Sequence, residues 1–273
     1  MTMRSVELFG MPFENVTMPQ ALERIDGLVR QPGRRYVMTP NIDAVVRWPK
    51  DPEFRDAYQR AALIFADGMP IVLASRLLGS PLKERIAGSD LFPRLCRQAA
   101  ERGHSVFFLG GQDGVAEQAA RNLRGRFPSL RVVGCYAPPI GFQFDAAEHE
   151  RMVQRVNSAR PDLLFLALGC PKQEKWIAKH IHELEVKVAV CVGAAIDFEA
   201  GTVRRAPRWM QRSGLEWLWR LVREPRRLWR RYLIEDTAFV GLFLSEWWRV
   251  CVRRAEAGGP VASSGPLRSG ESS

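Results

Sequence analysis

The feature that most constrains the fold is an alternation of short apolar runs with helical segments, which begins at residue 105. Apolar runs predict buried strands over residues 105–110, 131–136, 161–169 and 186–198. Segments with the pattern of helices lie between them, over 115–126, 146–159 and from about 172. Strands that alternate with helices of this length are typical of a parallel sheet with right-handed crossovers. The sequence therefore predicts an α/β fold.

The first hundred residues have the same alternation in a less regular form. They predict strands over 6–10, 34–39 and 62–67, and helices over 18–30 and 69–78. In parallel sheets of this class, ligands bind at the carboxyl ends of the strands. The residues at those ends form a set of candidate site residues, namely Thr39 to Asn41, Asp67 and Gly68, Gly110 and Gly111, 169–174 and 193–197.

Asp67 is the most informative acid in this set. It follows an apolar strand and precedes Gly68, a turn position at which a carboxylate can act as general base toward a hydroxyl nucleophile. Asp67 can equally cap the helix that starts near Met69, because an Asp before an early proline is common at a helix N-terminus. From the residues alone the cap is the favoured interpretation. Asp197, at the end of the expected strand over 186–198, has the same ambiguity.

Several cofactor and metal classes lack their signatures. The GGQDG segment, residues 110–114, can present backbone N–H groups to a phosphate or can simply form a tight turn. It is not G-x-G-x-x-G, and no acid ends the next strand to hold a ribose, which disfavours a nicotinamide-dependent oxidoreductase. No Walker motif is present, and the four histidines have no metal-ligand spacing. We therefore expect no metal and no cofactor.

Positive charge is concentrated near the C-terminus. The formal net charge of the chain is +10, and residues 202–254 contain thirteen arginines, no lysine and five acids, together with six of the eight tryptophans. We expect three parts: an α/β body over 1–201, a basic helical appendage over 202–254, and a disordered Gly/Ser/Pro-rich tail over 255–273.

The Arg/Trp composition of the appendage has three interpretations. Trp prefers the headgroup level of a bilayer and cations are drawn to anionic lipid, which favours a membrane surface as partner. A solvated Arg-rich helix that packs its tryptophans into the core is the plainer alternative. A nucleic-acid-binding protein is the third, although no recognised nucleic-acid-binding motif is present.

The rest of the chain predicts a cytoplasmic protein. The N-terminal segment lacks the apolar run of a signal peptide, and no apolar run approaches the ~20 residues of a spanning helix. Five scattered cysteines, an odd number without a C-x-x-C pair, favour a reducing compartment.

A series of motifs in fixed order resembles a known enzyme family. The resemblance covers about residues 5–235 and is to the bacterial glycosyltransferases that include the N-acetylmannosaminyltransferase of teichoic-acid synthesis, the N-acetylmannosaminuronic acid transferase of enterobacterial common antigen and the xanthan glucosyltransferase. The motifs are TPN (39–41), ADG (66–68), ERIAGSD (84–90), FLGG (108–111), GCPKQEKW (169–176), GAAIDFEAG (193–201), RRAPRW (204–209) and GLEWLWRLVREPRRLWRRY (214–232).

The resemblance implies a Rossmann-like parallel sheet with helices on both faces, plus a C-terminal helical appendage. It also implies inverting transfer of a sugar of the N-acetylmannosamine, N-acetylmannosaminuronate or glucose type. The implied donor is a UDP-sugar and the implied acceptor a polyprenyl-diphosphate-linked saccharide, in cell-surface or exopolysaccharide synthesis at the inner face of the cytoplasmic membrane. The ADG motif is followed here by Met69 and Pro70, where other members have Gly. The resemblance therefore does not assign this chain the donor sugar of any single member. Homo-oligomerisation stays open.

The resemblance also assigns roles to residues of the body. Asp67 becomes the catalytic base, which reverses the preference for a cap. Thr39 and Asn41 would orient hydroxyls of the acceptor or the sugar, and Gln173 would hold the sugar or the nucleotide. Arg85 would face phosphate, for which a planar guanidinium is well suited.

Arginines of the appendage complete the implied site. By spacing, the matches are Arg220, Arg227 and Arg230, which would bind the diphosphate of the leaving UDP in the absence of a metal. Arg220 and Arg227 are seven residues apart and would share one helical face if Pro225 does not interrupt the helix.

Overall fold

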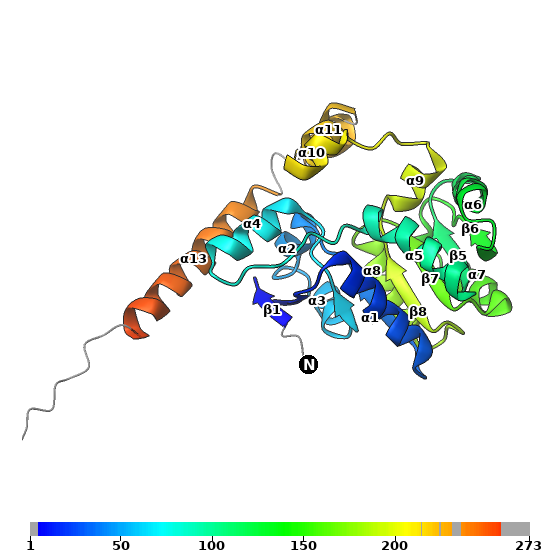
Figure 1. Ribbon diagram of the computed structural model, residues 1–273, viewed down its shortest axis with the longest axis horizontal. Coiled ribbons are helices and arrows are strands. Elements are labelled where there is room, and N and C mark those ends of the chain that lie inside the picture. The colour runs from blue at the N-terminus through cyan, green and yellow to red at the C-terminus, as the bar shows by residue number, and fades with distance from the viewer. Residues whose placement is uncertain (1–4, 214, 224, 231–235, 258–273) are drawn as a thin grey trace, which may run out of the picture.

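The protein folds around a six-stranded parallel sheet with helices on both faces (Figure 1). The computed structural model describes residues 5–213, 215–223, 225–230 and 236–257. The sheet has the order β4-β3-β8-β7-β5-β6. Its strands are β3 (Arg35–Met38), β4 (Leu63–Ile64), β5 (Ser105–Gly110), β6 (Arg131–Tyr136), β7 (Leu163–Ala167) and β8 (Val188–Cys191). The predicted α/β class is confirmed.

Nine helices are described in the body before Gly201, and four more follow it. The body helices are α1 (Met18–Arg30), α2 (Ile42–Arg47), α3 (Pro52–Gln59), α4 (Met69–Leu77), α5 (Gly88–Arg102), α6 (Val115–Arg126), α7 (Ala146–Ala159), α8 (Lys172–His180) and α9 (Ala195–Ala200). A short 3-10 helix covers Phe142–Phe144. The helices after Gly201 are α10 (Arg208–Ser213), α11 (Glu216–Arg223), α12 (Pro225–Arg230) and α13 (Ala238–Ala257).

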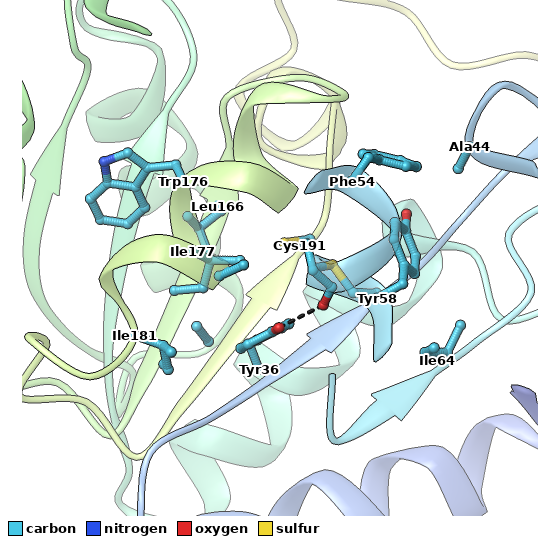
Figure 2. Packing of buried hydrophobic residues seen from close by; sticks show 14 of the residues in the cluster. Tyr36, Ala44, Phe54, Tyr58, Ile64, Leu166, Trp176, Ile177, Ile181 and Cys191 are labelled. Carbon is cyan, nitrogen blue, oxygen red and sulfur yellow. Dashed lines mark hydrogen bonds between the residues drawn. The ribbon is translucent and has the colours of Figure 1, made fainter. Parts of the chain in front are cut away.

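Alternate side chains of the strands β3, β8, β7 and β5 enter two separate hydrophobic clusters, one on each face of the sheet. In β7, Leu164 and Leu166 join the cluster covered by α2, α3, α7 and α8, part of which Figure 2 shows. Leu163 and Phe165 join the cluster covered by α1, α5, α6 and α9. Because both faces are covered, these strands are mostly apolar, and the sequence shows continuous apolar runs rather than alternation.

The N-terminal strands form a separate unit. β1 (Ser5–Leu8) and β2 (Met11–Glu14) pair as an antiparallel hairpin outside the main sheet. The sequence predicts the first of these strands but not the second, nor the hairpin. Phe9 and Gly10 link the two strands with positive φ values of 56° and 79°, so the turn has the backbone conformation typical of tight hairpins.

One predicted strand is wrong in its second half. The apolar segment over 186–198 forms β8 only as far as Cys191, and α9 begins at Ala195. Gly193 has a φ of 56°, a left-handed conformation that ends the extended run. Asp197 therefore lies in the first turn of a helix and does not end a strand. An apolar run with several alanines fits a buried helix as well as a strand, which explains the error.

The appendage packs one face of α13 against the body and exposes the other. Phe239, Leu242 and Phe243 contact the hydrophobic cluster beside α2. On the other side of α13, large apolar residues are exposed, namely Val240, Leu244, Trp247, Trp248 and Val252. Within the described residues, no helix combines the length and the apolar character needed to span a bilayer.

Candidate active site

A cavity of about 940 Å³ lies at the carboxyl ends of the strands and extends to the appendage. Five predicted site residues of the body, which come from four separate motifs, line this one cavity: Thr39, Asn41, Asp67, Arg85 and Gln173. The strand order explains why they meet. β3, β8 and β7 are neighbours at the centre of the sheet, so the loops that follow them open onto the same edge.

Asp67 is fixed by its backbone and by one hydrogen bond to its carboxylate. Its N–H donates to the Pro40 carbonyl at 2.9 Å, which ties the loop after β4 to the loop after β3. The Gly88 N–H, at the start of α5, donates to Asp67 Oδ2 at 3.1 Å. The N-cap of α4 is Gly68, and no side chain caps this helix. Asp67 therefore does not act as the helix cap that the sequence alone favours.

The surroundings of Asp67 change its acidity. Burial raises the pKa of the Asp67 carboxyl from 3.8 to about 6, against the positive charge of Arg85 and the Gly88 N–H, which both lower it. The carboxylates of Glu216 and Asp90 raise this pKa further. A carboxyl with a pKa near 6 is mostly ionised at neutral pH and still accepts a proton readily. Those are the properties that a general base requires.

Thr39 and Asn41 line the cavity, and the side chain of each also forms a hydrogen bond with the backbone. The Thr39 hydroxyl donates to the Cys191 carbonyl at 2.8 Å, which links the ends of β3 and β8. Asn41 Oδ1 accepts from the Ala44 N–H at 3.3 Å and caps α2. These bonds fix the orientation of both side chains. The predicted contacts to substrate hydroxyls would use the Thr39 oxygen lone pairs and the Asn41 amide NH₂.

Gln173 is buried with an unused acceptor. It lies near the start of α8 with only 5% of its surface exposed. Its amide nitrogen donates to Glu174 Oε1 at 3.0 Å, whereas its Oε1 has no hydrogen-bond partner among the described residues. A buried polar atom without a partner is uncommon in native proteins. A ligand donor in the cavity would satisfy it, in agreement with the predicted contact to sugar or nucleotide.

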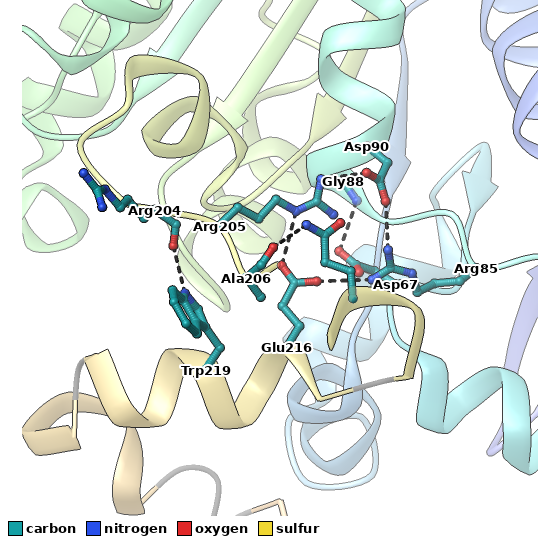
Figure 3. A network of polar contacts seen from close by, with 10 residues as sticks. Asp67, Arg85, Gly88, Asp90, Arg204, Arg205, Ala206, Glu216 and Trp219 are labelled. Atoms are coloured by element: carbon teal, nitrogen blue, oxygen red, sulfur yellow. Dashed lines mark hydrogen bonds and ion pairs between the residues drawn. The ribbon is translucent and has the colours of Figure 1, made fainter. Parts of the chain in front are cut away.

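Arg85 belongs to a network of ion pairs that Figure 3 shows. Its guanidinium contacts Asp90 Oδ2 at 2.9 Å and Glu216 Oε2 at 3.3 Å. Arg205 contacts the same two acids, Asp90 Oδ1 at 2.6 Å and Glu216 Oε1 at 3.3 Å. The network joins the loop before α5, the start of α5, the segment after α9 and the start of α11.

Four residues of this region have no assigned role in the sequence prediction, namely Gly88, Asp90, Arg205 and Glu216. Each lies within a motif that carries the family resemblance, ERIAGSD, RRAPRW or GLEWLWRLVREPRRLWRRY. The motifs mark the region, but a sequence cannot show that Asp90 and Glu216 both contact Arg85. The ion pairs join residues that are 131 positions apart for Arg85 and Glu216 and 115 positions apart for Asp90 and Arg205.

The appendage arginines lie on α11 and α12. α11 is described as far as Arg223 and α12 from Pro225, and residue 224 between them is outside the described residues, so a shared helical face of Arg220 and Arg227 stays a prediction. Their side chains are outside the described residues. Arg230 is exposed and does not line the described part of the cavity. Their diphosphate-binding role stays a prediction.

The GGQDG segment borders the same cavity through Gly111 and Gln112. At Gly110 a Cβ atom would lie 2.4 Å from the Ala167 carbonyl oxygen, and the φ of Gly110 is 122°. Both the close approach of β7 and the positive φ require a glycine here. The segment forms a turn between β5 and α6, and nothing in this geometry decides whether its N–H groups also bind a phosphate. Across the described residues, His, Cys, Asp and Glu side chains form no group of three or more that could hold a metal ion.

Comparison with known proteins assigns the chain to a family. The profile of the Glycosyl transferase WecG/TagA/CpsF family matches residues 6–251. The chain belongs to this glycosyltransferase family. It is 34% identical over 198 residues to an N-acetylglucosaminyldiphosphoundecaprenol N-acetyl-beta-D-mannosaminyltransferase of Bacillus spizizenii, which covers 72% of this chain and 74% of the relative.

Further relatives carry the same name. One from Staphylococcus aureus is 30% identical over 227 residues, 82% of this chain and 87% of its own length. One from Bacillus subtilis is 29% identical over 232 residues, 85% of this chain and 88% of its own length. The match includes the body and most of the appendage, so the protein is a hexosyltransferase, and the nucleic-acid-binding alternative gains no support.

Proposed function

We propose that the protein transfers a sugar from a UDP-sugar to a saccharide linked to a polyprenyl diphosphate, with inversion at the anomeric carbon. The observation that carries this proposal is a half-buried carboxyl, Asp67, with a pKa of about 6, in a 940 Å³ cavity of a glycosyltransferase. The names of the relatives favour an N-acetylmannosamine donor and an acceptor of the N-acetylglucosaminyl-diphosphoundecaprenol type.

The proposed reaction is a single displacement. Asp67 removes the proton from an acceptor hydroxyl, and the oxygen attacks the anomeric carbon as the bond to UDP breaks. The proton ends on the Asp67 carboxyl and the bonding electrons leave with UDP. One displacement at the anomeric carbon inverts its configuration, whereas a double displacement would retain it.

The remaining predicted residues bind the substrates. Gln173 would accept a hydrogen bond from the sugar or the nucleotide, and Thr39 and Asn41 would orient hydroxyl groups. Arg85 would meet the negative charge that develops on the leaving diphosphate, together with Arg220, Arg227 and Arg230 of the appendage. Fixed cations and backbone donors aimed at developing charge are an effective means of stabilising a transition state.

We further propose that residues 202–254 place the enzyme on an anionic membrane surface at the inner face of the cytoplasmic membrane. The exposed apolar side of α13, which includes Trp247 and Trp248, supports this proposal. So do the thirteen arginines of the segment. Apolar and aromatic side chains beside a cationic face are typical of helices that lie at a bilayer interface.

A panel of UDP-sugars offered with a synthetic lipid-diphosphate N-acetylglucosamine acceptor tests the reaction. We expect a single product whose new glycosidic bond, read by the one-bond carbon–proton coupling in NMR, has the anomeric configuration opposite to that of the donor. A product with retained configuration, or no transfer from any UDP-sugar, would contradict the proposal.

A further inference from the structure

Four charged side chains beside Asp67 form a closed ring in which each arginine contacts both acids. The separations in the ring of Arg85, Asp90, Arg205 and Glu216 range from 2.6 to 3.3 Å. Between 15% and 25% of each side chain is exposed, so water screens these pairs less than surface pairs. With two positive and two negative members the ring is neutral, and removal of any one member leaves a net charge near Asp67.

The ring joins the appendage to the base. Glu216 is the first residue of α11, whereas Arg85 and Asp90 belong to the body, and Arg205 lies in the segment that connects the two. Glu216 and Asp67 line the same cavity. Arg85 is the shared neighbour, since it pairs with Glu216 and its charge also acts on Asp67.

The charges around Asp67 come from several elements. Arg85 stabilises the ionised form of Asp67, whereas Asp90 and Glu216 oppose it. Arg205 offsets both of these acids through its ion pairs. The other ionisable side chains that line the described part of the cavity are Asp43 from α2, Tyr58 from α3, Cys170 before α8, Lys172 and Glu174 from α8, Asp197 from α9, and Asp236 before α13.

We propose that Glu216 is a positioning residue through which the appendage sets the protonation of the catalytic base, by holding the Arg85 guanidinium and placing one negative charge beside Asp67. This inference rests on the proposed role of Asp67. The substitution Glu216→Gln keeps the size of the side chain and removes its charge. Arg85 then acts on Asp67 without the opposing carboxylate, and the base ionises at lower pH.

Neutralising an acid of the ring and neutralising an arginine of the ring should move the pH profile in opposite directions. For Glu216→Gln we expect the acid limb of the pH profile of kcat/KM to move down by roughly 0.3 to 1 pH unit, the size expected for one nearby, partly screened charge. Arg205→Gln leaves two acids facing one arginine, so the acid limb moves up by a similar amount. A mere loss of packing would lower the rate in both variants without moving the limbs in opposite directions.

The test is the pH dependence of kcat/KM for the full chain, with the UDP-sugar donor and the lipid-diphosphate acceptor. Glu246→Gln is the matched control, because Glu246 lies on α13 and pairs with Arg249 at 3.2 Å, outside the ring. We expect no movement of its acid limb. Glu216→Asp, which restores the charge, is expected to return the limb toward the wild-type pH.

An unmoved acid limb in Glu216→Gln, or movement of the Glu216→Gln and Arg205→Gln limbs in the same direction, overturns the inference. If Glu216→Gln does not fold, Arg205→Gln decides alone, since only an upward movement agrees with the ring. The Asp67→Asn variant separates the two proposals. Wild-type turnover in that variant overturns the proposed role of Asp67 as the base. An inactive Asp67→Asn variant together with an unmoved acid limb in Glu216→Gln overturns only the role of Glu216.

Discussion

The N–H of Gly88 donates a hydrogen bond to the Asp67 carboxylate, and replacement of Gly88 by alanine is the most informative single change in the body. A Cβ atom at this position would lie 2.9 Å from the Val192 carbonyl oxygen and 3.0 Å from Thr39 Oγ1. Both neighbours belong to the floor of the cavity, so the start of α5 must move away from β8. That movement lengthens the hydrogen bond from the Gly88 N–H to Asp67 Oδ2, which is 3.1 Å in the wild type.

Two effects of Gly88→Ala have a calculable size. Overpacking of a well-packed interior costs about 1–3 kcal/mol of folding free energy. The Gly88 N–H lowers the pKa of Asp67, so a weaker hydrogen bond lets this pKa rise above about 6. The acid limb of kcat/KM should therefore move to higher pH by up to roughly 1 unit, the scale of one hydrogen bond to a charged group.

The assay combines the pH profile with urea unfolding. Gly125→Ala is the control, because Gly125 lies within α6 and a Cβ atom there meets nothing within 4 Å. We expect Gly125→Ala to stabilise the protein by up to about 1 kcal/mol and to leave the pH profile unchanged. If Gly88→Ala has the free energy of unfolding of the wild type and an unmoved acid limb of kcat/KM, then Gly88 does not fix Asp67 in the way proposed.

Three further predictions concern the same site and the appendage. Gln173→Met removes the buried side-chain oxygen that can accept a hydrogen bond. It should raise the KM for the UDP-sugar by about tenfold, the value of one hydrogen bond, with a smaller change in kcat. An unchanged KM in steady-state assays would show that Gln173 does not contact the UDP-sugar. Asp67 has a pKa of about 6 in the folded protein against 3.8 as its ordinary value, so its contribution to stability falls as the pH rises between these values. Asp67→Asn should therefore be more stable than the wild type at pH 7 by about 1–3 kcal/mol. Urea unfolding at pH 4 and pH 7 checks this, and an equal difference at both pH values would speak against a raised pKa of Asp67. Removal of residues 202–273 should abolish sedimentation with anionic vesicles and most of the transfer activity. Removal of residues 258–273 alone should leave both unchanged. Full activity of the chain that lacks residues 202–273, measured on a soluble acceptor, would contradict the role of the appendage.

Much of the fold follows from local patterns. The helices α1, α6 and α7 begin and end at the residues that their apolar spacing predicts, and the strands β5 and β6 match their apolar runs. Those elements were predictable because the helices have one dominant period, the strands are short apolar runs, and Gly, Pro or Asp residues mark their boundaries. α9 was not, because an alanine-rich apolar segment after β8 has no period that separates strand from helix.

Part of the candidate site was likewise predictable from the sequence, and part was not. Strand ends identify Asp67, Thr39 and Asn41 because the carboxyl edge of a parallel sheet is a property of topology, which the alternation of elements already indicates. The role of Asp67 needed more than its position, since a base and a cap look alike in sequence. The ion pairs of Glu216 with Arg85 and Arg205 depend on how α11 packs against the body, and no local pattern contains that information.

The central claim is that Asp67 is the general base of sugar transfer. Turnover of UDP-sugar by Asp67→Asn, measured with the lipid-diphosphate acceptor alongside UDP affinity by calorimetry, tests it directly. We expect a loss of about 100- to 10,000-fold in kcat, the typical contribution of a general base, with UDP affinity close to that of the wild type. Turnover at the wild-type rate would contradict it.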